Sequence, residues 1–366
     1  MRVVVTGASG LVGGHVAEAL RERGHDTTVF VRRGSAAPEG HRVERGDVGS
    51  PGDLRHAFAK ANAVVHCAAP YSYDLSAEAL TAAHVRGTRT VLEAAAESGV
   101  RRVVVTSSSV TCGSSADPRA VDEGHRPGAE FVPAYFQAKA DQEDLTLTLG
   151  PVLGLDVVVA CPTVVLGGPD RKLVPSNAVL ARYLMDPMRS TFPGGCNVVA
   201  AADVGRGHAL LVESGAPGQR YLLGGQNLRW RDLHQMVSDM VGVGSPQFEV
   251  DATVAMATAA ASEWWSRLTG STAWVTEEEV KTVGRYYWYD HSKVAALGYA
   301  PMPAHESVAI ALSWLLASTH LPRWVREGLR PTPEVRRARP LIPRSLEQPA
   351  PARPKRAKKA VASDQG

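Results

Sequence analysis

The stretch that decides the fold is at the N-terminus, where residues 3–13 have the sequence VVVTGASGLVG. Its first three residues form a continuous apolar run, which is typical of a strand buried on both faces of a parallel sheet. Glycines then follow at a spacing of three, at Gly7, Gly10 and Gly13. Apolar residues at helical spacing continue to Gly24, and a second β-branched run covers residues 27–31. The stretch therefore predicts a strand, a glycine turn, a helix and a second strand.

The glycine turn has the chemistry of a binding site for a pyrophosphate. Gly7 allows the tight turn, Gly10 lets the backbone approach the phosphates without a Cβ, and Gly13 lets the helix pack closely against the strand. Free N–H groups at the start of the helix face the anion. A plain turn with three glycines is the alternative, but the flanking strand and helix favour dinucleotide binding. The predicted cofactor contacts are Gly7, Ser9, Gly10, Leu11, Val12 and Gly13.

The residue that ends the second strand bears on which dinucleotide is bound. At this place an acidic side chain binds the ribose 2′-hydroxyl of NAD, whereas an arginine accommodates a 2′-phosphate. The chain has Arg32 here, followed by Arg33, and no acidic residue nearby. A guanidinium pairs strongly with phosphate, so Arg32 favours NADP, with NAD as the other candidate. Two solvated loop arginines are the alternative interpretation.

Strands and helices alternate along the first half of the chain. The pattern predicts further strands over residues 43–48, 63–69, 102–108 and 155–162, and helices over residues 53–61, 76–98 and 135–149. This rhythm predicts an α/β fold with a doubly wound parallel sheet, known as a Rossmann fold.

The second half of the chain has a different character, because all seven tryptophans lie after residue 225. We expect a smaller C-terminal substrate-binding lobe that closes a pocket, although these side chains could instead fill a small core. The predicted division is a dinucleotide-binding domain over 1–165, a mixed lobe with returning elements of the first sheet over 166–325, and a tail over 326–366. Proline and arginine dominate from Arg330 on, which predicts a disordered basic tail.

Composition narrows the class of protein. The chain of 366 residues is 44% hydrophobic and 21% charged, with a net charge of +3. These values are ordinary for a globular enzyme, and the basic excess gathers in the tail. We therefore expect no nucleic-acid partner, and a solubilising role for the tail.

The cysteines and the apolar runs indicate the cellular setting. The four cysteines, Cys67, Cys112, Cys161 and Cys196, form no CxxC pair, so neither a metal site nor a disulfide pattern is visible. A strand that begins at residue 2 leaves no room for a signal peptide, and no apolar run reaches eighteen residues. We expect a cytoplasmic protein without a membrane span that acts on a small molecule; a homodimer is left open.

Three residues converge on one chemistry. Tyr135 and Lys139 are four positions apart on a predicted helix and share a face. Ser108 follows the fifth strand, at the sheet edge where doubly wound folds bind ligands. A lysine ammonium stabilises a neighbouring phenolate, so Tyr135 can exchange a proton with an alcohol while the serine hydroxyl holds the same oxygen. The spacing Tyr-x-x-x-Lys alone is a common coincidence, but its combination with the glycine turn is specific.

With these motifs, residues 1 to 320 resemble the extended short-chain dehydrogenase/reductases of the NAD-dependent epimerase/dehydratase family. The resemblance rests on TGASGLVG at 6–13, Gly46-Asp47, Ser107-Ser108, Tyr135-x-x-x-Lys139 and Pro162-Thr163. Within the family the chain is most similar to the dihydroflavonol-reductase-like branch, which includes cinnamoyl-CoA reductases and 3β-hydroxysteroid dehydrogenases. The sequences VRGT at 85–88, PTVVLG at 162–167 and YLLGGQN at 221–227 carry this closer likeness.

The resemblance implies further cofactor contacts. Lys139 would hold the nicotinamide ribose beside Tyr135, and Asp47 the adenine. Pro162 and Thr163 would line the nicotinamide site. The same resemblance adds Val48, Ala68 and Val165 to the cofactor-binding residues.

Departures from the family pattern bear on the reaction. His84 stands where the family usually has asparagine, so the usual hydrogen-bonded support would need the imidazole as donor. Ser109-Val110 replaces the Asp-Glu pair of the dehydratases, which argues against sugar dehydration. Residues 197–204 lack the arginine that nucleotide-sugar enzymes often direct at the diphosphate, and this argues against an epimerase.

The sequence thus predicts an NADP(H)-dependent reductase or dehydrogenase that interconverts a ketone and a secondary alcohol on a small apolar or aromatic molecule. Ser108, Tyr135 and Lys139 would carry the reaction. One rival is a sugar epimerase that uses its bound NAD(P) transiently, and net consumption of NADPH separates the two. The other is a cofactor-sensing binding protein without turnover, which would not need Tyr-x-x-x-Lys.

Overall fold

The computed structural model describes residues 1–69, 77–127, 133–269, 280–338 and 346. Its main feature is a seven-stranded parallel sheet with the strand order β10-β6-β5-β4-β1-β2-β3. In that order, the strands are Arg220–Leu223, Asp156–Pro162, Arg102–Thr106, Ala63–His66, Arg2–Thr6, Asp26–Val31 and Arg42–Arg45. The predicted doubly wound α/β fold is confirmed, and the glycine turn follows β1, an interior strand between β4 and β2.

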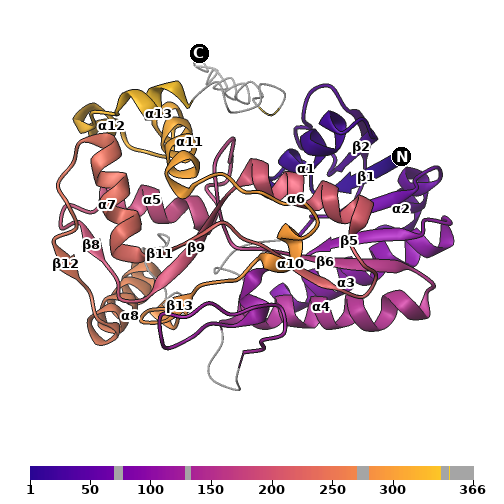
Figure 1. Ribbon diagram of the computed structural model, residues 1–366, viewed down its shortest axis with the longest axis horizontal. Helices are drawn as coiled ribbons and strands as arrows, with labels where there is room; N and C mark the ends of the chain where they lie inside the picture. The colour runs from indigo at the N-terminus through magenta and orange to yellow at the C-terminus, as the bar shows by residue number, and fades with distance from the viewer. Residues whose placement is uncertain (70–76, 128–132, 270–279, 339–345, 347–366) are drawn as a thin grey trace, which may run out of the picture.

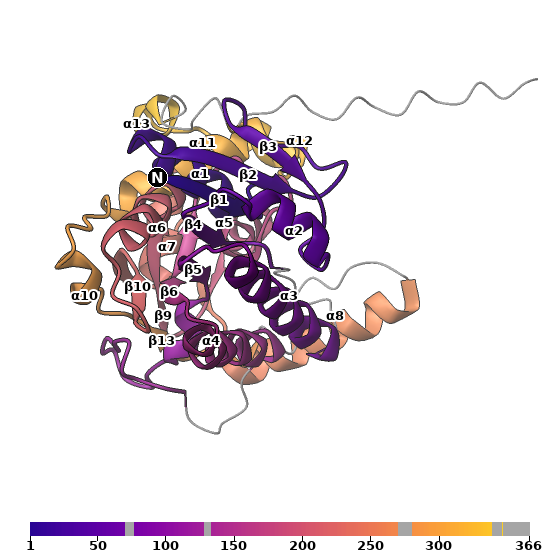
Figure 2. The ribbon, with the colours of Figure 1, turned by 90° about the vertical axis from the view of Figure 1, so that its right-hand side faces the viewer.

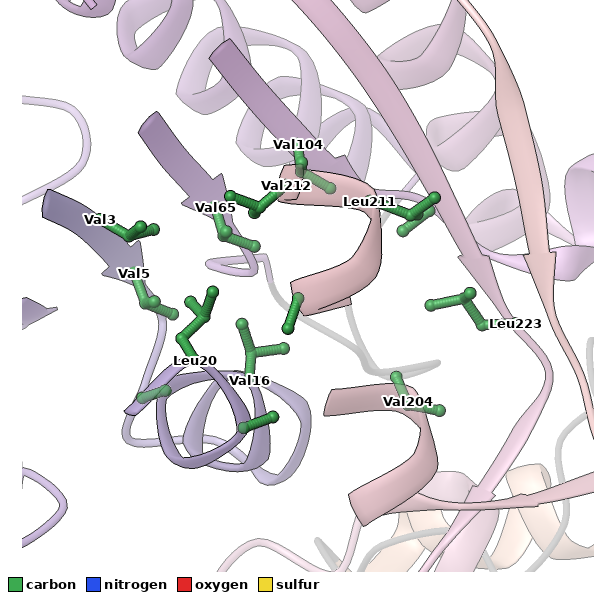
Figure 3. Packing of buried hydrophobic residues seen from close by; sticks show 14 of the residues in the cluster. Val3, Val5, Val16, Leu20, Val65, Val104, Val204, Leu211, Val212 and Leu223 are labelled. Carbon is green, nitrogen blue, oxygen red and sulfur yellow. The ribbon is translucent and has the colours of Figure 1, made fainter. Parts of the chain in front are cut away.

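Helices cover both faces of this sheet (Figures 1 and 2). One face carries α1 (Leu11–Glu22) and α6 (Ala201–Ser214), and the other carries α2 (Pro51–Phe58), α3 (Ala77–Glu97) and α4 (Ala134–Val152). The alternation along β1 shows why: Val3 and Val5 pack toward α1, whereas Val4 packs with the residues of the opposite face. Figure 3 shows the first of these layers, with Val16 and Leu20 of α1 facing Val3, Val5 and Val65.

A second, mixed sheet forms the part of the molecule that we call the C-terminal lobe. Its strand β9 (Gly195–Ala200) pairs with β7 (Val164–Leu166), β11 (Gln226–Arg229) and β13 (Tyr286–Tyr287). The helices packed around it are α5 (Pro175–Met185), α7 (Trp230–Val241) and α11 (Ala304–Ala317). The short strands β8 (Ser190–Thr191) and β12 (Phe248–Glu249) pair with each other. The remaining helices are α8 (Ala252–Thr269), α10 (Ser292–Ala295), α12 (Arg323–Gly328) and α13 (Pro333–Arg337).

The two sheets are joined tightly because the chain leaves β9 directly into α6, which packs on α1 of the first sheet. A Cβ at Gly205 of α6 would lie 2.4 Å from the carbonyl oxygen of His15 in α1, so only glycine permits this approach. His15 also donates from Nε2 to the carbonyl of Gly168, after β7, at 3.1 Å. The loop that leaves β7 is therefore fixed to the first helix.

The prediction of disorder from Arg330 on is wrong for the residues up to Ala338. They include the helix α13, and Val335 and Ala338 are buried in the core of the C-terminal lobe with residues of α7 and α11. Leu346 is buried as well. The prediction used the average proline and arginine content, which does not reveal these few buried apolar residues. The rest of the tail lies outside the described residues.

None of the described helices is both long and apolar enough to span a membrane. Within the described ranges, no group of three or more His, Cys, Asp or Glu side chains could hold a metal ion. Cys161 is fully buried in β6, whereas Cys67, which follows β4 (Ala63–His66), is half-buried.

The packing of α13 makes a prediction about stability. Val335→Ala should lower the free energy of unfolding by about 2 kcal/mol, because it removes two buried methyl groups and leaves a cavity. Thermal unfolding followed by circular dichroism measures the change. Arg336→Ala, at an exposed position of the same helix, is the matched control and should leave the melting temperature unchanged. Equal melting temperatures for the two variants would show that α13 does not pack as described.

Candidate active site

The glycine turn has the geometry that pyrophosphate binding requires. A Cβ at Gly7 would lie 2.7 Å from the backbone nitrogen of Ala68, and a Cβ at Gly13 would lie 2.4 Å from the carbonyl oxygen of Gly7. Both positions therefore demand glycine for close packing. Ser9 and Gly10 are exposed, and the nearest atom to a Cβ at Gly10 is 3.4 Å away. The first turn of α1 contains no acidic residue, so its free N–H groups can donate hydrogen bonds to an anion.

The residues predicted to meet the adenosine lie after β2 and β3. Arg33 donates from Nη2 to both carboxylate oxygens of Asp53, at 3.1 and 3.2 Å. Asp53 also accepts from the backbone nitrogen of Asp47 at 3.0 Å. Arg32 is exposed, whereas the guanidinium of its neighbour is already paired. Asp47 is exposed and Val48 is half-buried, so both can be reached from solvent.

Lys139 of α4 reaches the carboxyl end of β5. Its Nζ donates to the carbonyl of Thr106 and to Oε1 of Gln142, each at 2.9 Å. The side chain is only 4% exposed, and burial lowers the pKa of Lys139 to about 8. An ammonium has three N–H groups, and these two bonds use two of them. The third can therefore serve a ligand.

Tyr135 lies one turn before Lys139 and is enclosed by apolar and aromatic side chains. It packs with Leu80, Phe136 and Val110, the last of which is two residues after Ser108. The His84 ring lies edge-on to the Tyr135 ring, with 5.9 Å between the centroids. The structure thus places the predicted serine, tyrosine and lysine around the carboxyl end of β5.

His84 takes part in the hydrogen-bonded support of this site. Its Nδ1 donates to Oε1 of Gln142 at 3.4 Å, the same oxygen that accepts from Lys139. Gln142 donates in turn from Nε2 to Oγ1 of Thr88 at 2.8 Å. The imidazole therefore contacts both the tyrosine ring and the partner of the lysine.

A buried carboxylate, Glu143, fixes the loop that carries Ser108. It accepts from the hydroxyl groups of Ser107 at 2.9 Å and Thr111 at 2.8 Å, and these residues flank Ser108. Its charge is balanced by Arg126 and Arg220, which approach to 2.8 and 2.6 Å. A buried carboxylate with this many partners holds the loop in one conformation. The Ser108 hydroxyl accepts from the backbone of Val110 at 3.5 Å.

Two neutral histidines support the strand ends beside the site. His66 is hydrogen-bonded to Thr6 at 2.8 Å, and His208 to the Thr106 hydroxyl at 2.9 Å. The Nδ1 of His208 donates to the carbonyl of Val204, so its Nε2 accepts from Thr106. Burial lowers the pKa of His66 to about 3 and that of His208 to about 4, so both stay uncharged at neutral pH.

The Pro162-Thr163 segment consists of the last residue of β6 and the residue before β7, and it is bonded to the C-terminal lobe. Thr163 donates from Oγ1 to Oδ1 of the buried Asn197, at 2.8 Å, and this oxygen also accepts from the backbone of Gly225. Val165 is buried in β7. The segment predicted to line the nicotinamide site is therefore fixed by contacts from β9 and from the turn before β11.

Sequence reasoning missed Gln142, Glu143 and Asn197. The first two had a signal, because they lie three and four positions after Lys139 and so share its helix face. No signal in the sequence pointed to Asn197, because its hydrogen-bond partners come from segments far apart in the chain.

The comparisons with known proteins agree with this geometry. The model of the NAD dependent epimerase/dehydratase family matches residues 3–224. The chain belongs to this family. It is 30% identical over 85% of its length to a protein named as a dihydroflavonol 4-reductase of Synechocystis, of which it covers 93%. It is 29% identical over 87% of its length to cinnamoyl-CoA reductase 1 of rice, of which it covers 92%.

A solved structure extends the likeness to three dimensions. The crystal structure of gox2253 has a TM-score of 0.77 and 31% identity, covering 87% of this chain and 99% of that one. The chain is thus an extended short-chain dehydrogenase/reductase, an NAD(P)-dependent enzyme with relatives among the reductases and dehydrogenases.

The lowered pKa of Lys139 predicts a pH dependence of stability. The folded protein releases this proton near pH 8, whereas an unfolded lysine keeps it to about 10.4. Between these values the unfolded state binds more protons, so this residue makes stability rise with pH. Below pH 8 the lysine is charged in both states, so the full cost of burying its charge lowers the free energy of unfolding.

Chemical denaturation from pH 7 to 10.5 measures this contribution. Lys139→Met should raise the free energy of unfolding above that of the parent. This gain should be largest at pH 7 and should shrink toward pH 10.5. Lys60→Met, at an exposed lysine, is the matched control. A difference for Lys139→Met that is the same at every pH would contradict the buried charge.

Proposed function

We propose that this chain is an NADP(H)-dependent oxidoreductase that interconverts a ketone and a secondary alcohol on a small apolar or aromatic substrate. The observation that carries the proposal is the bond from Lys139 to the carbonyl of Thr106 at the end of β5. It holds α4 against the strand that leads to Ser108, so that one ammonium, one phenol and one hydroxyl surround the same sheet edge. This edge is where parallel folds bind their ligands.

Each residue has a distinct task in this proposal. Tyr135 gives a proton to the oxygen of the ketone, or takes it from the alcohol. Ser108 donates a hydrogen bond to the same oxygen as charge develops on it. Lys139 supplies a positive charge one helical turn away and an N–H group for the cofactor ribose. A nicotinamide cofactor held by these residues would supply or accept the hydride.

The surroundings of Tyr135 favour an apolar or aromatic substrate. Leu80, Val110 and Phe136 pack with the tyrosine, and Tyr287 lies edge-on to Phe136 with 6.0 Å between the ring centroids. Two of the relatives are named for reduction of a dihydroflavonol and a cinnamoyl-CoA. Cytoplasmic localisation, a homodimer and the domain boundaries after residues 165 and 325 stay predictions.

The cofactor contacts that we propose are the glycine turn, Arg32, Asp47, Val48, Ala68, Tyr135, Lys139, Pro162, Thr163 and Val165. Arg32 supports NADP over NAD because its guanidinium is exposed at the end of β2, while that of Arg33 is held by Asp53.

Removal of the Tyr135 hydroxyl tests the proton donor. Tyr135→Phe should lower turnover at least about a hundredfold, because general acid–base catalysis contributes two to four powers of ten. The assay follows NADPH oxidation with aryl ketones and NADP⁺ reduction with hydroxysteroids, and cofactor binding should survive. Tyr183→Phe, which removes a buried hydroxyl of the C-terminal lobe, is the control. Near-normal turnover by Tyr135→Phe would exclude this tyrosine as the donor.

A matched pair of arginine variants tests the cofactor preference. The parent should bind NADPH at least about tenfold more tightly than NADH, a difference of about 1.4 kcal/mol. Arg32→Ala should narrow this gap much more than Arg33→Ala, because the Arg32 guanidinium is exposed whereas that of Arg33 is already paired with Asp53. Titration of nicotinamide fluorescence gives both affinities. Equal affinities in the parent would refute the preference.

A further inference from the structure

Gly14 of α1 has a function that the glycine motif does not explain. It lies inside a helix, where glycine is about 1 kcal/mol less favourable than alanine, and it is not one of the three motif glycines. A Cβ at this position would lie 3.3 Å from Cδ2 of Leu346 and 3.3 Å from the carbonyl oxygen of Ala8. The missing side chain therefore makes room for Leu346.

Leu346 is buried on the first domain, whereas the described residues that precede it in the sequence, 333–338, belong to the C-terminal lobe. It is 6% exposed and packs on α1. Val335 and Ala338, by contrast, are part of the core built around α7 and α11. The C-terminal part of the chain is thus anchored on both halves of the molecule, and its second anchor lies against the glycine turn.

Leu346 also closes a small cavity at the pyrophosphate site. The cavity has a volume of about 20 Å³, and its lining includes Ser9, Gly10, Pro38, Arg171 and Leu346. This volume holds roughly one water molecule and no phosphate group. A dinucleotide held by the N–H groups of the turn would therefore lie outside the cavity, against the residues that line it, including Leu346.

Another part of the cavity lining is held by hydrogen bonds. It includes Pro169 and Arg171, from the loop after β7. Asp170, which is buried between them, accepts from the backbone of Val174 at 2.7 Å and from Nδ2 of Asn177 at 3.0 Å. These hydrogen bonds fix the part of the lining that comes from the loop after β7.

We infer that Leu346 retains the bound dinucleotide by closing the side of the pyrophosphate site. An apolar side chain here keeps water away from the N–H groups of the turn and strengthens their bonds to the phosphates. The inference rests on the proposed binding of NADP(H) at this turn. It assigns Leu346 a function in cofactor retention.

Two changes to the full-length protein test this function. Leu346→Ala, and a chain that ends at Ala338 and keeps α13, should both release NADPH at least about tenfold faster than the parent. The release rate is measured by stopped-flow fluorescence, with NADPH-loaded protein mixed with excess NADP⁺. Leu329→Ala removes a similarly buried leucine from the core of the C-terminal lobe and should release NADPH at the parent rate.

The other outcomes overturn the inference in distinguishable ways. Release at the parent rate by both variants would show that Leu346 has no function in retention. Slower release, or tighter binding, would show that Leu346 competes with the cofactor instead. A parent protein that binds neither NADPH nor NADH would refute the proposed function itself together with this inference.

Discussion

The bond between the Lys139 ammonium and the carbonyl of Thr106 is the interaction on which the candidate site depends. A buried cation is costly unless it is hydrogen-bonded, so this bond commits α4 to one position against the end of β5. The neighbouring polar side chains are arranged around the lysine in this position. Gln142 accepts a second bond from the lysine, and His84 reaches the same oxygen while its ring contacts Tyr135.

Glu143, one turn after Lys139 on α4, fixes a second part of the site. Its carboxylate holds Ser107 and Thr111 on either side of Ser108, and Arg220 brings a charge from β10, at the edge of the sheet. One helix thus presents the tyrosine, the lysine and the carboxylate that fixes the serine loop. A rigid site of this kind holds its donors in place before a substrate arrives, which is the condition for strong electrostatic catalysis.

Local patterns in the sequence were sufficient for the fold, and they also led to the three residues that we propose as reactive. The strand, turn and helix of residues 2–22 follow from the apolar run and the glycine spacing, and the Tyr135–Lys139 spacing follows from helix geometry. Asn197 could not be found in this way, because its bonds to Thr163 and Gly225 join segments that meet only in the folded chain. The tail was predicted wrongly up to Ala338 because composition averages over single buried residues such as Val335.

The transfer of hydride from cofactor to substrate tests the central claim most directly. NADPH that carries deuterium at the reactive carbon of the nicotinamide would be incubated with the protein and aryl ketones and, in a parallel reaction, with a nucleotide sugar. The proposed function predicts an alcohol product with deuterium on its carbinol carbon and an equal amount of NADP⁺. Turnover that inverts a sugar stereocentre without net consumption of NADPH would contradict it and identify an epimerase instead.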